Sequence, residues 1–465
     1  MMTPRPYQEE AIQHLVDLHN RGLRGLVNGS DMGTGKTLQA IELMRRLDLP
    51  TLAVVPKVTV PSWDRHAAEQ GTDVSAINWE MVRTGRTPYG KWDDAGEFHW
   101  DPAIKFLIFD EAHRAMGRDS KNSQLVRAAR RQNILSLVMS ATLADTPLEM
   151  DALGYVLRLH DGYRPKTTLR DVMQGREVVS FSQWTAKHGC GLVDGEWAFR
   201  GTETARAKHM AKINAALYPH KGVRIRIPDL GDQFPECQIT AELYETDQPD
   251  RVDRLYAEMA AQLAVLYERM QQDVGGPATD NLRAHQEIEL LKVPVLLDQT
   301  QEAISAGRSV CLFVNYRATL QELCRRLGTN CFIDGTQAGP GGAKRREENR
   351  QRFQQDLERA IIIQNEAGGV GLDLPDIHGE YPRTSLVSPG FNAKTARQVS
   401  GRTRRDTSQS KSQVRFIFLR GTCEERIHKA VDQSIQKALA RKLNHLDALN
   451  DGDLMPENMR IYRTF

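Results

Sequence analysis

The chain has 465 residues, of which 40% are hydrophobic and 26% are charged. This composition excludes a disordered or collagen-like chain, and the length predicts about three domains. No apolar run approaches the roughly 18 residues that a membrane span needs, and no apolar stretch of signal-peptide length follows the first residues. We therefore expect a protein that is neither embedded in a membrane nor secreted. The six cysteines lie far apart and show no metal-binding spacing, which favours ordinary reduced thiols.

The formal net charge is only +2, but the charge is unevenly distributed. Residues 382–442 contain fourteen Lys and Arg against four Asp and Glu. A localised basic face releases counterions when it binds nucleic acid, so this region is a candidate for phosphate contacts. The alternative for the same composition is a solvated helix surface.

Two parts of the chain alternate short apolar strands with amphipathic helices. The strands are predicted at 25–27, 51–55, 104–109, 135–139, 310–314, 331–333, 360–364, 385–387 and 414–419. The helices are predicted at 7–19, 37–47, 317–327 and 345–354. This alternation is typical of doubly wound α/β domains with parallel sheets. The polar segment between the two parts is predicted to form helices at 203–217 and 250–272.

Residues 30–37, Ser-Asp-Met-Gly-Thr-Gly-Lys-Thr, follow a predicted strand and begin a predicted helix. That context is what a phosphate-binding loop requires, although Ser30 stands where glycine is more usual. Glycines let backbone N–H groups turn toward phosphate oxygens, the lysine reaches the β and γ phosphates, and the final threonine offers its hydroxyl to Mg²⁺. The sequence therefore predicts that ATP and Mg²⁺ are bound here. The candidate residues are Gly33, Thr34, Gly35, Lys36 and Thr37.

A second candidate group follows the strand at 104–109, 74 residues beyond Lys36. Asp110 is expected to hold Mg²⁺, and Glu111 is expected to act as the general base on the attacking water. Considered alone, acidic residues after a strand are often helix caps. The preceding strand and the spacing from the phosphate loop favour the catalytic interpretation.

These motifs resemble those of superfamily two helicases. The runs Asp-Glu-Ala-His at 110–113 and Ser-Ala-Thr at 140–142 are similar to motifs two and three of that superfamily. The run Arg-Pro-Tyr-Gln at 5–8 is similar to its adenine-reading segment, which makes Gln8 the expected base reader. The resemblance also implies that His113, Ser140 and Thr142 couple hydrolysis to movement.

Within the superfamily, the second half of the chain resembles the Swi/Snf-like ATPases. Residues 365–374, Asn-Glu-Ala-Gly-Gly-Val-Gly-Leu-Asp-Leu, are similar to Swi/Snf motif five, and residues 398–405, Gln-Val-Ser-Gly-Arg-Thr-Arg-Arg, are similar to motif six. An arginine supplied across a cleft stabilises the charge of a transferring phosphoryl group. The resemblance implies that Arg402 and Arg405 do so here. It also assigns Gly371 and Asp373 to the nucleotide and Gln398 to coupling.

The resemblance implies two RecA-like, doubly wound parallel-sheet lobes with a partly helical insertion between them. We expect lobe 1 at 1–158, the insertion at 159–294, lobe 2 at 295–442 and a tail at 443–465. The segments at 199–202 and 224–228 resemble the compact annealing-helicase branch of the family, and the chain's size also suits a phage or bacterial type.

The expected track is double-stranded DNA, held mainly through its phosphates. Candidate contacts are Lys57, Arg317, Gly368 and Gly369. The leading hypothesis is an ATP-driven translocase that remodels DNA, anneals it or migrates branches without necessarily separating strands. The alternatives are a strand-separating DNA or RNA helicase and a catalytically decayed DNA-binding scaffold. The expected location is the cytoplasm of a bacterium or of a virus-infected cell, or a eukaryotic nucleus.

Overall fold

The computed structural model describes residues 3–419 with several gaps. The gaps are 73, 118–119, eight positions between 164 and 176, 194, 245–249, 251–285, 338–339, 366–371, 391–392 and 406. Apart from position 250, the helix predicted at 250–272 lies outside the described residues, as does the tail predicted at 443–465. The described residues form two compact units, one extending to Gly231 and one beginning at Asp232.

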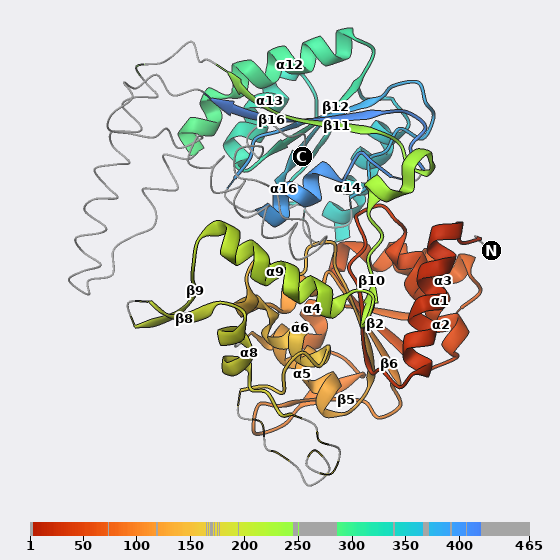
Figure 1. Ribbon diagram of the computed structural model, residues 1–465. Coiled ribbons are helices and arrows are strands. Elements are labelled where there is room, and N and C mark those ends of the chain that lie inside the picture. The colour runs from red at the N-terminus through yellow and green to blue at the C-terminus, as the bar shows by residue number, and fades with distance from the viewer. Residues whose placement is uncertain are drawn as a thin grey trace. The chain divides into compact units, whose positions relative to one another are not determined.

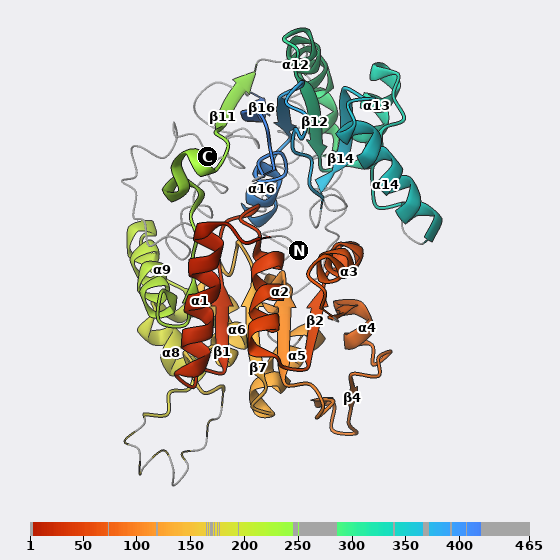
Figure 2. The ribbon, with the colours of Figure 1, turned by 90° about the vertical axis from the view of Figure 1, so that its right-hand side faces the viewer.

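The first unit is built on a six-stranded parallel sheet in the order β10-β1-β7-β6-β2-β3 (Figures 1 and 2). Its strands are β1 (Gly25–Asn28), β2 (Thr51–Val55), β3 (Ser75–Asn78), β6 (Phe106–Asp110), β7 (Leu135–Met139) and β10 (Gly222–Val223). All four strands predicted for this part are present. The short edge strands β3 and β10 were not predicted.

Helices cover both faces of this sheet. One face packs against α1 (Pro6–Asn20), α2 (Lys36–Leu47) and α3 (Val60–Glu69). The other packs against α5 (Lys121–Arg131), α6 (Asp151–Val156), α8 (Phe181–Lys187) and α9 (Glu203–Leu217). Successive side chains of a strand point to opposite faces, so Ile108 joins the first core and Leu107 the second. Strands that are buried on both faces explain the nearly continuous apolar runs in the sequence.

Shorter elements complete the first unit. They are α4 (Trp79–Arg83), the 3-10 turns η1 (Lys57–Thr59), η2 (Ala112–Ala115) and η3 (Pro147–Met150), and the antiparallel hairpins β4 (Gly90–Trp92) with β5 (Phe98–Trp100) and β8 (Cys190–Val193) with β9 (Glu196–Phe199). None of the described helices is both long enough and apolar enough to cross a membrane.

The second unit contains another six-stranded parallel sheet, in the order β11-β16-β15-β12-β14-β13. Its strands are β11 (Cys237–Tyr244), β12 (Ser309–Val314), β13 (Phe332–Ile333), β14 (Ala360–Gln364), β15 (Arg383–Val387) and β16 (Ser412–Leu419). The helices given by the structure are α12 (Val293–Ser305), α13 (Arg317–Leu327), α14 (Pro340–Gln354) and α16 (Ala393–Ser400). The predicted class, two doubly wound parallel-sheet lobes, is confirmed.

The segment predicted as an insertion, 159–294, supplies a strand to each sheet. Strand β10 pairs with β1 of the first sheet, and β11 pairs along its whole length with β16 of the second. Between them, the turn η4 (Ile227–Gln233) bends at Gly231, whose φ of 53° and ψ of −131° suit glycine. The proposed boundaries at 158, 294 and 442 remain a prediction.

Candidate functional site

The predicted phosphate loop connects β1 to α2 in the first unit. Gly33 and Gly35 have φ of 83° and 82°, a left-handed conformation that explains why glycine occupies both positions. Lys36 begins the helix, and its ammonium donates to the carbonyl oxygens of Ser30 and Asp31 over 2.8 and 3.0 Å. The loop therefore curls around the lysine head group and has the shape expected of an anion cradle.

The charge of Lys36 depends on its surroundings. Burial lowers the pKa of its ammonium to about 8, although the carboxylates of Glu111, Asp110 and Asp31 act in the opposite direction. These carboxylates lie near enough to act on the lysine, so the structure brings the two predicted halves of the site together.

Gln8, the predicted base reader, lies against the phosphate loop. Its side-chain nitrogen donates to the Thr34 carbonyl oxygen over 3.0 Å, and its side-chain oxygen accepts from the Arg5 backbone N–H over 2.9 Å. A Cβ atom at position 35 would lie only 2.3 Å from the Gln8 amide nitrogen, so Gly35 is required for this packing as well. Base reading itself remains a prediction.

Asp110 stands at the carboxyl end of β6, two strands from β1. Two tryptophans donate hydrogen bonds to it: Trp63 to the carboxylate over 3.2 Å and Trp79 to the backbone carbonyl over 3.0 Å. Burial and the neighbouring charge of Glu111 raise the pKa of the Asp110 carboxyl, whereas the hydrogen bond from Trp63 and the charge of Lys36 lower it. Glu111 follows with φ 49° and ψ 50°, a strained conformation for a residue with a Cβ.

The predicted coupling residues of the first unit also meet. The Nδ1 atom of His113 lies 3.2 Å from the Ser140 hydroxyl and 3.2 Å from a Glu111 carboxylate oxygen. The Ser140 hydroxyl donates to the Thr142 carbonyl oxygen over 3.0 Å and accepts from the Thr142 N–H over 3.2 Å. Neighbouring strands β6 and β7 thus connect the predicted general base to the Ser-Ala-Thr turn.

In the second unit, the predicted arginine pair follows α16. Arg402 and Arg405 are buried, and Arg405 forms an ion pair with Asp373 in which its Nε donates over 2.8 Å. Gln398 is buried at the end of α16. Asp373, which was assigned to the nucleotide, therefore holds an arginine of its own unit. Gly371 lies outside the described residues.

No family model matches the chain. A protein of Acanthamoeba polyphaga mimivirus, provisionally named an ATP-dependent RNA helicase, is 28% identical over 97% of this chain and 84% of its own length. The human SWI/SNF-related matrix-associated actin-dependent regulator of chromatin subfamily A member 1 is 28% identical over 31% of this chain. The Arabidopsis thaliana protein CHROMATIN REMODELING 24 is 23% identical over 91% of it.

These relatives and the residues of the site described above point to the same class of protein. The chain is similar to the Swi/Snf-like ATPases of helicase superfamily two. It spans only 16% of the human relative and 45% of the Arabidopsis one, so those whole proteins contain much that this chain does not match. In structure, it resembles a variant of S. cerevisiae Dbp5 bound to RNA and ADP BeF3, with a TM-score of 0.50 and 13% identity over 97% of this chain and 92% of that one. This likeness confirms the two-lobed fold.

Two of the predicted nucleic-acid contacts are exposed at the carboxyl ends of strands. Lys57 follows β2, and Arg317 begins α13 after β12 with its Nε 3.6 Å from an Asp334 carboxylate oxygen. The loop before Arg317 is fixed by the buried Glu289, which accepts hydrogen bonds from the backbone N–H groups of Asn315 and Tyr316 over 2.8 and 2.9 Å. Gly368 and Gly369 lie outside the described residues.

Sequence reasoning missed what the buried tryptophans near the site do. Trp63, Trp79 and Trp100 are buried. Two of the three, however, also hold Asp110 through their indole N–H groups.

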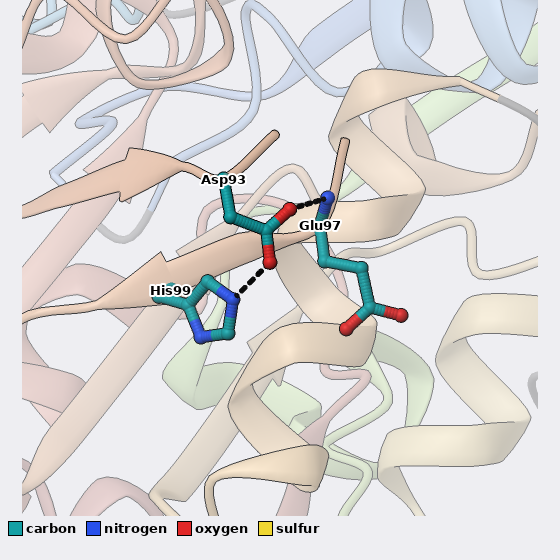
Figure 3. Close-up of side chains that lie close together, drawn as sticks. All are labelled: Asp93, Glu97 and His99. Atoms are coloured by element: carbon teal, nitrogen blue, oxygen red, sulfur yellow. Dashed lines mark hydrogen bonds and ion pairs between the residues drawn. The ribbon is translucent and has the colours of Figure 1, made fainter. Parts of the chain in front are cut away.

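Among the described residues, one group of three side chains has ligand atoms close enough for a metal: Asp93, Glu97 and His99 of the β4–β5 hairpin. Figure 3 shows the Asp93 carboxylate accepting from the Glu97 backbone N–H over 2.7 Å while its other oxygen lies 2.7 Å from the His99 ring. All three residues are exposed. These contacts close the hairpin turn, so we assign the group to local structure.

Proposed function

We propose that this chain is an ATP-driven translocase on double-stranded DNA. The observation that carries the proposal is the group formed by Lys36, Asp110, Glu111 and His113 at the carboxyl edge of the first sheet. An ammonium proposed to bind phosphate follows β1, and a buried carboxylate, a candidate general base and a proposed coupling histidine follow β6, two strands away in the same sheet. Such an arrangement supports phosphoryl transfer to water.

In the proposed site, Lys36 binds the β and γ phosphates and the Glu111 carboxylate takes a proton from the attacking water. Carboxylate and hydroxyl oxygens are the ligands that Mg²⁺ prefers, so the oxygens of Asp110 and Thr37 fit this ion. When bound, Mg²⁺ would neutralise charge on the phosphate oxygens. Trp63 holds the Asp110 carboxylate, and Trp79 holds the backbone carbonyl of the same residue.

Arg402 and Arg405 are proposed to stabilise the γ-phosphate when the lobes close. Arg405 would then exchange its Asp373 partner for phosphate oxygens, which couples closure to hydrolysis. Gln398, Ser140 and Thr142 are proposed to transmit that change, and Gly371 to approach the nucleotide. This division of roles rests on the family resemblance and, for the residues other than Gly371, on their placement within their own units.

Double-stranded DNA is proposed as the track because the curated relatives include chromatin remodellers and because residues 365–374 resemble Swi/Snf motif five. Lys57, Arg317, Gly368 and Gly369 are the proposed phosphate contacts, since a stepping motor must bind the backbone without reading bases. The proposed place of action is the cytoplasm of a bacterium or a virus-infected cell, or a nucleus.

A second candidate function is favoured by one observation: the mimivirus relative, which matches nearly the whole chain, is provisionally named an RNA helicase. The Ser-Ala-Thr run at 140–142 agrees with that alternative. It predicts that single strands or RNA, rather than duplex DNA, stimulate ATP turnover.

The deciding experiment is steady-state ATP hydrolysis by wild type and by Lys36→Ala, without polynucleotide and with duplex DNA, single-stranded DNA or RNA at one salt concentration. We expect duplex DNA to stimulate most, and a triplex strand to be displaced without unwinding of a fork. Stimulation by RNA or single strands alone, with fork unwinding, would establish the helicase. If the wild type hydrolyses no ATP under any of these conditions, the result would favour a DNA-binding scaffold without catalytic activity.

A further inference from the structure

The segment that follows α9 runs alongside the phosphate loop. Within this segment, residues 222 and 223 form β10, in which Gly222 pairs with Val27 and Val223 with Asn28. The pairing continues into the loop itself, because the Gly29 N–H donates to the Val223 carbonyl oxygen over 3.0 Å and the Asp31 N–H donates to the Ile225 carbonyl oxygen over 2.9 Å. Backbone hydrogen bonds of the β-sheet type therefore continue from β10 along one side of residues 29–31 and hold the start of the phosphate loop.

Side chains of the loop take part in the same contact. The Ser30 hydroxyl accepts a hydrogen bond from the Ile225 N–H over 3.0 Å, and the Asp31 carboxylate accepts one from the Ile227 N–H over 2.9 Å. A glycine at position 30, the more usual residue in such loops, has no acceptor to offer. The departure from the usual pattern at Ser30 thus has a structural reason in this chain.

Arg224 joins the two segments by charge. Its Nη2 atom lies 2.8 Å from an Asp31 carboxylate oxygen, and its Nη1 donates to the Gly29 carbonyl oxygen. Only 5% of the arginine side chain and 16% of the aspartate side chain are exposed, so solvent screens the pair weakly. The positive charge of Arg224 also contributes to lowering the pKa of Lys36, which places the guanidinium near the phosphate-binding ammonium.

We propose that Arg224 is a positioning residue of the ATP site, which fixes the phosphate loop through Asp31 and the Gly29 carbonyl while Lys36 binds phosphate. The inference rests on the proposed ATP-binding function of the loop. Lys36 can exchange its hydrogen bonds to the Ser30 and Asp31 carbonyl oxygens for bonds to a phosphate. The loop keeps its conformation during this exchange because Arg224 and the backbone at 225–227 still bind it. A preorganised cradle costs little reorganisation when the ligand arrives.

The alternative is that Arg224 contacts the phosphates directly. The two roles differ in what Asp31 does. If Arg224 acts through Asp31, removing either partner loosens the loop, and removing both does no further damage. If Arg224 binds phosphate itself, removing Asp31 frees its charge, and ATP affinity stays the same or rises.

The test is a double-mutant cycle on Arg224→Ala and Asp31→Ala, with Arg226→Ala as control because Arg226 lies two residues along and pairs with Asp229. The Kd of a fluorescent ATP analogue and the KM and kcat for ATP are measured for each variant. We expect each single variant to raise Kd and KM about tenfold and the double variant to raise them by about the same factor, with kcat changing less.

A charge-reversed pair, Arg224→Asp with Asp31→Arg, should recover part of the lost affinity, whereas each reversal alone should not. Additive losses, a Kd unchanged by Asp31→Ala, or a Kd for Arg224→Ala equal to that of the Arg226→Ala control would each overturn the proposal. If Arg224→Ala does not fold, as judged by circular dichroism, Arg224→Lys tests the same point because it keeps the charge and loses the two-pronged contact. A wild type that binds no ATP analogue would instead refute the proposed function.

Discussion

The indole N–H of Trp63 donates a hydrogen bond to the Asp110 carboxylate over 3.2 Å. Trp63 lies in α3, and its side chain is 1% exposed, so the bond is shielded from water. The bond stabilises the ionised form of a carboxyl group whose pKa burial and Glu111 raise. Trp63, which packs in the core, therefore also lowers the pKa of the proposed Mg²⁺ ligand.

Trp63→Phe should move the acidic limb of the activity profile to higher pH. The change keeps most of the packing but removes the hydrogen bond that lowers the Asp110 pKa, so the carboxyl would be protonated at a higher pH and would lose its affinity for Mg²⁺. The shift should be about one pH unit at most, as expected for one hydrogen bond. It is measured as kcat/KM for ATP against pH. Trp100→Phe is the matched control, because that buried indole donates to the Leu125 carbonyl oxygen over 3.1 Å; equal shifts in both variants would contradict the assignment.

ATP affinity should fall as the pH rises through about 8. Lys36 binds phosphate only as the ammonium, and its pKa is lowered to about 8, so the charged fraction declines above that pH. The measurement is the Kd of a fluorescent ATP analogue without Mg²⁺ between pH 7 and 9.5. Lys36→Arg should flatten this profile, since a guanidinium stays charged throughout. A wild-type profile as flat as that of the arginine variant would show that Lys36 does not control binding.

His113→Ala and Ser140→Ala should each uncouple hydrolysis from nucleic acid. The two side chains contact each other over 3.2 Å, so either change breaks the same connection between β6 and β7. We expect the ratio of stimulated to basal turnover to fall about tenfold in each variant and no further in the double variant. Ser136→Ala is a suitable control, because its buried hydroxyl donates to the Ile134 carbonyl oxygen instead. Losses that add in the double variant would rule out a shared connection.

Arg405→Ala should lower kcat for ATP by about 10² or more while changing the Kd for ATP only a few fold. The reason is that an arginine at the γ-phosphate acts mainly on the transition state. Single-turnover hydrolysis under saturating nucleic acid measures the effect. Arg404→Ala serves as the comparison, since the Arg404 guanidinium donates to the Pro235 carbonyl oxygen. An equal loss in both variants would point to damage to the second unit rather than to catalysis.

Much of the fold follows from local patterns. The strands predicted at 51–55 and 135–139 have the same bounds in the structure, as does the helix predicted at 203–217. A parallel strand buried on both faces is a continuous run of apolar residues, which is visible in the sequence without knowledge of its neighbours. Strands β3 and β10 were missed because they are short edge strands, and only pairing with β2 and β1 makes them strands.

The amino-acid sequence by itself determined the local structure around the predicted phosphate loop and the Asp-Glu-Ala-His run, because a strand, a tight turn and a helix start are set by neighbouring residues. The tertiary structure alone decided which side chains support that chemistry. Trp63 is 47 positions from Asp110, and Arg224 is 195 positions from Gly29. Contacts over such separations depend on the order in which strands join the sheet, and that order is settled by packing across the whole unit rather than by local sequence.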